Sequence, residues 1–375
     1  MLFPNPLSFI FALLLCLPLA ILFTINSLTT IDSGDPSNDP FVLPLQSPKL
    51  PPEDDDFLFP LAAGVNATPS PTHKLAFMFL TNSPLPFAPL WELFFENVPT
   101  DLFNVYIHAD PAGEYDPPFS GVFAHRVIPS KPTRRFSPSL AAAARRLLAH
   151  ALLHDSANSM FALLSPSCIP LHSFNFTYRT LIRSKKSFIE ILRNEIGAFD
   201  RWAVRGPDVM LPVVKLADFR IGSQFWVLTR RHAPLVVRDQ RVWSKFKLPC
   251  VRWYICYPEE NYFPTLLNMW DRRGVVPATL THVDWNGSLD GHPRTYEASE
   301  VGQDLIRELR MARPRYGDGG MRIRMKSRQR GGGGGGRNWP VGKSQGEHPF
   351  LFARKFSAES LQPLMNISMD FILRD

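Results

Sequence analysis

Residues 75–80 read LAFMFL, a continuous apolar run typical of a strand that is buried on both faces of a sheet. Two more short apolar runs follow, FNVYI at residues 103–107 and FALL at residues 161–164. Segments with helical spacing lie between them, at residues 88–97 and 139–154. Short apolar strands that alternate with helices predict an α/β fold, in which a parallel-rich sheet is wrapped by helices.

Ligands of such sheets bind just beyond the carboxyl ends of the strands. The residues that follow the three predicted strands are 81–83, 108–110 and 165–168, and they are candidates for a nucleotide pocket. The chain contains neither a Gly-x-Gly-x-x-Gly sequence nor a Walker loop. The sequence therefore does not support a dinucleotide-binding or phosphate-loop protein.

The second half of the chain has weaker periodicity. We expect a strand at residues 222–228, a loop that runs into a helix at 257–269, and an amphipathic helix at 299–310. An apolar strand at 350–355 and a closing helix at 358–364 complete the predicted elements.

Residues 7–25 contain no charge and are long enough to cross a bilayer as a helix. A cleaved signal peptide is the alternative, but no basic leader precedes the run and no small-x-small cleavage site follows it. We therefore expect a signal-anchor with residues 1–6 in the cytosol and the rest of the chain in the lumen, as in a single-pass type II protein.

Residues 26–73 are rich in Pro, Asp and Ser, and predict an extended stem ahead of a globular domain at residues 74–375. The stem includes the acidic run PPEDDD, within which Asp54–Asp56 forms an Asp-x-Asp sequence. Such a sequence holds a metal–nucleotide in many sugar transferases. Inside a run of acids in a linker, we interpret it as a solvated charge cluster.

The net charge of +7 comes from one stretch of the chain. Residues 307–337 contain ten basic and two acidic residues, a local charge of +8, so the remainder carries −1. Within the segment 311–349, which has no core-forming pattern, six glycines follow one another at 331–336. The basic pI therefore says little about the partners of the folded domain.

The chain has four cysteines, and Cys16 lies in the apolar run. The other three, Cys168, Cys250 and Cys256, allow at most one internal disulfide in an oxidising compartment. Neither the cysteines nor the histidines have the spacing of a zinc site. Sequons at Asn66, Asn175, Asn286 and Asn366 support a secretory location only together with the anchor.

Three groups of residues are candidates for chemistry. Glu259 and Glu260, flanked by aromatic residues, could place a base at a sugar pocket, or could be solvent-facing acids at a helix start. Arg354 and Lys355 could neutralise a leaving diphosphate, or could be an exposed basic pair at a strand end. Trp285 could be an acceptor platform or part of a core corner.

Eight strings together resemble one known family, in the same order along the chain. They are KLAFMFLTNSPLPFAPLWELFF (74–95), VYIHADP (105–111), RVIPSKP (126–132), LLSPSCIPL (163–171), FRIGSQFWVLTRRHA (219–233), YPEENYFPTLL (257–267), THVDWNGSLDGHP (281–293) and FLFARKFSAESLQPL (350–364). They are similar to the plant core-2/I-branching β-1,6-N-acetylglucosaminyltransferase-like proteins of glycosyltransferase family 14.

The resemblance implies a Golgi membrane protein of type II with a GT-A-like nucleotide-sugar-binding fold and a lumenal catalytic domain. It implies inverting transfer of an N-acetylglucosamine-type or related sugar from a UDP-sugar to a glycan or glycoprotein acceptor, with no metal cofactor. By the matching motifs, Glu260 is the expected catalytic base and Lys355 a contact of the nucleoside diphosphate. Trp285 is the expected acceptor contact, and Asp110 is expected to approach the nucleotide.

The chain departs from the family pattern in three places. Glu259-Glu260-Asn261 stands where the family usually has Asp-Glu-His, and Pro166 replaces a glutamate. A cysteine-containing segment with a second diphosphate-binding arginine is expected within 311–349, where this chain has no cysteine. Alternatives to an active transferase are a weakened member that binds glycans or partners, and, if the basic stretch met cytosol, a nucleic-acid-binding protein.

Overall fold

The computed structural model describes residues 54–68, 70–286, 292–318 and 348–375, all of which belong to the unit Pro51–Asp375. The predicted anchor at 7–25 lies outside the described residues, and so do residues 319–347 of the basic segment. Among the described residues, no helix combines the length and the apolar character needed to span a bilayer.

The main sheet contains six strands: β1 (Lys74–Thr81), β2 (Phe103–Ala109), β3 (Asn158–Leu164), β5 (Ser187–Phe188), β6 (Val227–Thr229) and β7 (Val275–Val276). Their order is β2-β1-β3-β6-β5-β7. β1 is parallel to both β2 and β3, and β5 is parallel to β7, whereas β6 is antiparallel to its two neighbours. The predicted α/β fold with a parallel-rich sheet is confirmed.

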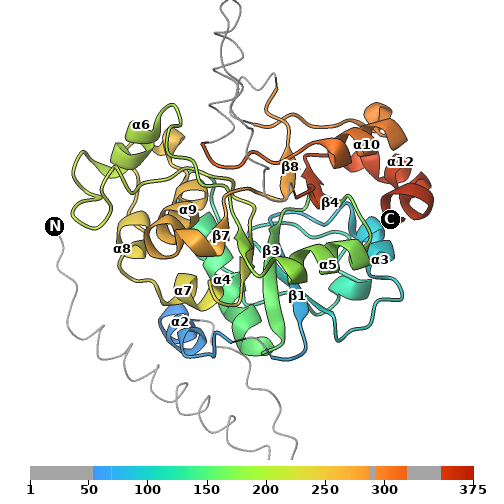
Figure 1. Cartoon of the computed structure of the whole chain (residues 1–375), viewed down its shortest axis with the longest axis horizontal. Helices are drawn as coiled ribbons and strands as arrows, with labels where there is room; N and C mark the ends of the chain where they lie inside the picture. The colour runs from blue at the N-terminus through green and yellow to red at the C-terminus, as the bar shows by residue number, and fades with distance from the viewer. Residues whose placement is uncertain (1–53, 69, 287–291, 319–347) are drawn as a thin grey trace, which may run out of the picture. The chain divides into compact units, whose positions relative to one another are not determined.

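Helices cover both faces of this sheet (Figure 1). One face packs against α2 (Asp55–Ala63), α4 (Ser139–His154), α6 (Ala198–Trp202), α7 (Ala233–Arg238), α8 (Trp243–Phe246) and α9 (Pro258–Trp270). The other packs against α3 (Ala88–Phe95), α5 (Phe174–Ser184), α10 (Gln303–Met311) and α12 (Leu361–Asn366).

Strand β1 shows why residues 75–80 are all apolar. Ala76 and Met78 point into the first layer of helices, whereas Leu75, Phe77 and Phe79 point into the second. Successive side chains of a strand face opposite sides, and both sides are covered here, so every position after Lys74 is buried.

A smaller sheet contains β4 (Ile169–Pro170), β8 (Thr281–Val283) and β9 (Phe352–Arg354), in the order β4-β9-β8. β9 is the central strand, parallel to β8 and antiparallel to β4. This sheet brings the Arg354-Lys355 pair, at the end of β9, next to the segment that carries Trp285.

The prediction of a strand at 222–228 is wrong for most of its length, because β6 begins at Val227. Gly222 instead donates its backbone N–H to the carbonyl of Glu260, at 2.8 Å. A Cβ at this position would collide with the carbonyl oxygen of Glu190, so only glycine permits the approach. The segment before β6 thus packs against the start of α9.

The prediction of an extended stem at residues 26–73 is also wrong for residues 55–63, which form the helix α2. This helix packs against α4 and α7, and buries Leu58 and Phe59. Burial of a large apolar side chain contributes about 1.5–3 kcal/mol, and the helix dipole favours the acidic residues Asp55 and Asp56 in the first turn. The helix is short and follows a Pro-rich run, so its apolar residues gave no recognisable period.

The acidic run around α2 has structural partners. The carboxylate of Asp54 accepts a hydrogen bond from the backbone N–H of Asp56 and caps the helix. Asp55 forms ion pairs with the buried Arg146 of α4 and with Lys131. The Asp-x-Asp sequence is therefore part of the packing of α2, and the interpretation as a solvated cluster does not hold for Asp55.

The predicted helices differ from the observed ones at their ends and, in one case, by an interruption. The helix at 139–154 matches α4, and the helix at 88–97 ends at Phe95. The predicted helix at 299–310 is a short 3₁₀ turn followed by α10, and the closing helix is likewise a 3₁₀ turn followed by α12.

Cys250 and Cys256 form a disulfide, and Cys168 is a buried free thiol. This agrees with the expectation of at most one bridge, and it selects the pair that the sequence left open. The bridge closes a short loop directly before α9, the helix that carries Glu259 and Glu260.

Candidate active site

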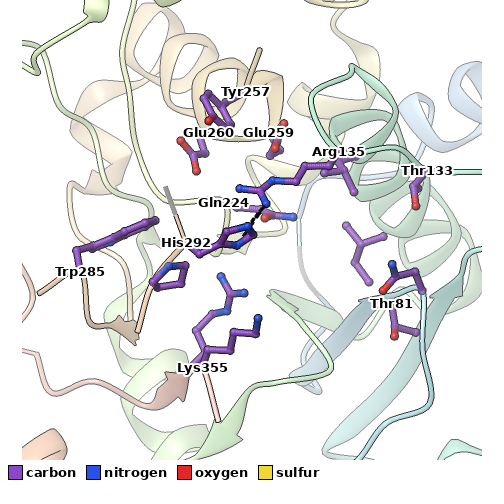
Figure 2. Close-up of a pocket in the computed structure, with 15 residues that line it drawn as sticks. Thr81, Thr133, Arg135, Gln224, Tyr257, Glu259, Glu260, Trp285, His292 and Lys355 are labelled. Atoms are coloured by element: carbon purple, nitrogen blue, oxygen red, sulfur yellow. Dashed lines mark hydrogen bonds between the residues drawn. The ribbon is translucent and has the colours of Figure 1, made fainter. Parts of the chain in front are cut away.

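A cavity of about 330 Å³ opens beyond the carboxyl end of β1 (Figure 2). This volume lies at the lower end of the range for small-molecule sites. The polar and aromatic side chains around it come from segments far apart in the sequence: Thr81, Asn82, Thr133, Arg135, Gln224, Tyr257, Glu259, Glu260, Trp285, His292, Arg354 and Lys355.

Only one of the three predicted strand ends lines this cavity. Thr81 and Asn82, after β1, do so. The residues after β3 do not, because Ser165 and Cys168 are buried and contact each other. The residues after β2 are also absent from the wall.

Glu260 lies in the first turn of α9, which begins with Pro258 at a position where proline favours a helix start. The helix dipole favours a carboxylate there. The Arg201 guanidinium donates a hydrogen bond to Glu260 Oε2 at 2.7 Å, and it also stacks 4.6 Å from the centre of the Tyr257 ring. The Glu260 side chain is 24% exposed, so it is held in place and still accessible from the cavity.

Glu259 is in a different environment from its neighbour. Its side chain is buried, and its Oε2 atom has no hydrogen-bond partner among the described residues. Burial and the adjacent Glu260 charge raise the pKa of Glu259 to about 8, so its carboxyl group is mainly protonated at neutral pH. The alternative of two solvent-facing acids is wrong for Glu259.

Arg354 and Lys355 lie on the opposite wall, at the end of β9. The Arg354 guanidinium lies 4.5 Å from the centre of the Phe225 ring, and its burial lowers the pKa of this arginine. The alternative of an exposed basic pair is therefore wrong for Arg354. The Lys355 ammonium group has no hydrogen bond or ion pair with a described residue and points into the cavity (Figure 2).

Trp285 follows β8 at the edge of the cavity, with 55% of its surface exposed. An indole this exposed is not part of a core corner. Figure 2 shows its ring on the same side of the cavity as Glu260. An exposed aromatic face beside a carboxylate provides a surface on which a sugar ring can stack.

Asp110 is buried and does not line the cavity. Its carboxylate accepts hydrogen bonds from the backbone N–H and the hydroxyl of Thr133, and from the backbone N–H of Ala112. Although burial alone would raise it, these hydrogen bonds hold the pKa of Asp110 below its usual value. The structure thus places Asp110 behind Thr133 and outside the lining of this cavity, and the contact of this carboxylate with a nucleotide stays a prediction.

Comparison with known proteins identifies the family. A sequence model described as Core-2/I-Branching enzyme matches residues 75–310, well over half of the chain. The chain belongs to the Core-2/I-branching enzyme family. It is also 28% identical to a rice (Oryza sativa subsp. japonica) protein named Glycosyltransferase BC10, in an alignment 327 residues long that covers 79% of this chain and 77% of the rice protein. The resemblance stated from the motifs is confirmed, and the chain is a glycosyltransferase by family.

Several residues of this Core-2/I-branching enzyme site escaped sequence reasoning. Arg201 and Arg135 stand in segments without a motif, so no local signal distinguishes them from exposed arginines. Gln224 lies within the string GSQFW, which indicated the family but gave no role for the glutamine. His292 lies just beyond a turn-rich segment. Their positions depend on how distant loops meet.

The four sequon asparagines, Asn66, Asn175, Asn286 and Asn366, are all exposed. Asn175 lies on α5, whereas Asn286 directly follows Trp285, which lines the cavity. All four side chains are therefore accessible to solvent.

Proposed function

We propose that this Core-2/I-branching enzyme is an inverting glycosyltransferase with a GT-A-like fold. It transfers a sugar of the N-acetylglucosamine type, or a related one, from a UDP-sugar to a glycan or glycoprotein acceptor. One observation carries the proposal. Glu260, Trp285 and Lys355, which are separated by 25 residues or more in the sequence, line the same cavity beyond a parallel strand.

In the proposed reaction, Glu260 accepts the proton of an acceptor hydroxyl as its oxygen attacks the anomeric carbon of the donor. The bond from that carbon to the diphosphate oxygen breaks as the new C–O bond forms, so the configuration inverts. UDP leaves with the electron pair of the broken bond. Lys355, on the opposite wall, neutralises the charge that develops on the diphosphate.

We further propose that the reaction needs no metal cofactor. Among the described residues, no three His, Cys, Asp or Glu side chains gather in a way that could hold an ion. Lys355 and Arg354 supply positive charge at the place where a metal would otherwise be needed.

A transfer assay tests these proposals together. The purified full chain should release UDP and form a glycosylated product with at least one donor from a panel that includes UDP-N-acetylglucosamine. The rate should stay within about twofold in excess EDTA. Loss of activity in EDTA that Mn²⁺ restores would contradict metal independence. Binding of UDP without product from any donor would favour the weakened, glycan- or partner-binding alternative.

We propose a Golgi membrane location, with a single-pass type II topology and a lumenal catalytic domain. The apolar residues 7–25, the Cys250–Cys256 disulfide and the exposed sequons support it. Peptide mapping of protein from its native host should find N-glycan on Asn175 or Asn286, and such glycan would also exclude contact with nucleic acid in the cytosol. Unmodified asparagines at every sequon, in a protein that fractionates away from the Golgi, would contradict this location.

A further inference from the structure

Arg135 is a cation at the cavity that neither a motif nor the proposed reaction uses. It lies in the loop between β2 and α4, and its side chain extends across the cavity toward His292 (Figure 2). Its guanidinium donates a hydrogen bond to the His292 ring and packs 4.6 Å from the centre of the Phe136 ring.

The loop that carries Arg135 is fixed on both sides of this residue. On one side, Thr133 is bound by the buried Asp110 carboxylate. On the other, the Phe136 ring makes edge-to-face contacts with Trp253 and Tyr257, at 5.6 and 5.5 Å between ring centres. Two anchors this close in sequence leave the backbone of Arg135 little freedom, so the guanidinium is directed at the cavity before a ligand arrives.

The charge of Arg135 is not balanced by a carboxylate. No described carboxylate forms an ion pair with it. Of the two acids on the cavity wall, Glu260 is paired with Arg201, and Glu259 is mainly protonated at neutral pH. With Arg354 and Lys355 on the opposite wall, the cavity has a surplus of positive charge.

A surplus of cations around a cavity at a strand end suits a ligand with several negative charges. Given the proposed function, on which this inference rests, that ligand is the nucleoside diphosphate of the donor. We propose that Arg135 is a second cationic contact of the donor diphosphate, and that it binds from the wall opposite Lys355. Asp110 is no contact of the ligand in this proposal, and it fixes one side of the loop through its hydrogen bonds with Thr133.

The test compares ligands that differ only in phosphate. Binding of UDP and of uridine to the full chain is measured by calorimetry or by saturation-transfer NMR. Arg135→Ala should weaken UDP binding about 10- to 100-fold, the usual loss for a hydrogen bond to a charged group, and should leave uridine binding within about twofold. Arg135→Lys should recover part of the loss.

Arg134→Ala is the matched control, because it removes the same charge from the neighbouring exposed residue, which does not line the cavity. It should bind UDP like the unmodified chain. The inference is overturned if Arg135→Ala binds UDP as tightly as Arg134→Ala does. It is also overturned if the affinities of Arg135→Ala for UDP and for uridine fall by the same factor, which would indicate a collapsed loop. Failure of the unmodified chain to bind UDP at all would instead overturn the proposed function.

Discussion

Replacement of Glu260 by glutamine should reduce the rate of sugar transfer about 10²- to 10⁴-fold, the usual contribution of a general base. An amide cannot accept the proton of the acceptor hydroxyl, whereas it fills nearly the same volume as the carboxylate. The partner Arg201 is partly exposed, so water can solvate its guanidinium in the variant and the fold should persist. UDP binding, measured by calorimetry, should stay within about twofold because the proposed contacts of the diphosphate are Lys355 and Arg135, and Glu260 is not one of them.

Glu259→Gln is the matched control for this experiment, one residue earlier in the same helix. Because the pKa of Glu259 is raised to about 8, its carboxyl group is already mainly uncharged at pH 7, and glutamine changes little there. We expect a loss of less than tenfold at pH 7. A rate for Glu260→Gln within tenfold of the unmodified enzyme would rule out Glu260 as the base.

Replacement of Lys355 by alanine should lower kcat/KM for the UDP-sugar about 10²- to 10³-fold, as does the removal of one preorganised charge contact at a reacting centre. The side chain has no other partner among the described residues, so its loss should not disturb the fold. Steady-state kinetics over a range of donor concentrations will measure the effect.

Two further variants make the result for Lys355 specific. Lys355→Arg keeps the charge and should lose less activity than the alanine variant. Lys247→Ala removes an exposed lysine that does not line the cavity, and should behave like the unmodified enzyme. Equal losses in Lys355→Ala and Lys247→Ala would mean that Lys355 acts only through the overall charge of the protein.

The parts of the fold that were predicted correctly are those with a local signal. The runs at 75–80 and 103–107 lie within parallel strands. A strand that is buried on both faces is mostly apolar, and this composition is the local signal. The helix at 139–154 was predicted to the residue, because its alanines and leucines repeat with the helical period. The prediction of a strand at 222–228 was wrong because Gly222 contacts the start of α9, and no local sequence pattern indicates this contact.

The candidate site was predicted unevenly for a related reason. Glu260, Trp285 and Lys355 were found through strings that resemble a family, and the cavity does bring them together. Arg135 and Arg201 were missed because neither lies in a recognisable motif or in a segment with periodicity. Their importance comes from where their guanidinium groups lie, beside His292 and Glu260.

The sequence by itself determined the alternation of strands and helices and the family of the chain, since burial imposes a period on local residues and motifs keep their order. Only the tertiary structure decided that Glu259 is buried while Glu260 is accessible, that Asp110 binds Thr133 and does not reach the cavity, and which two cysteines pair. These features depend on contacts between segments that are far apart along the chain. Hydrophobic periodicity records whether a residue is buried, but not which distant residue it meets.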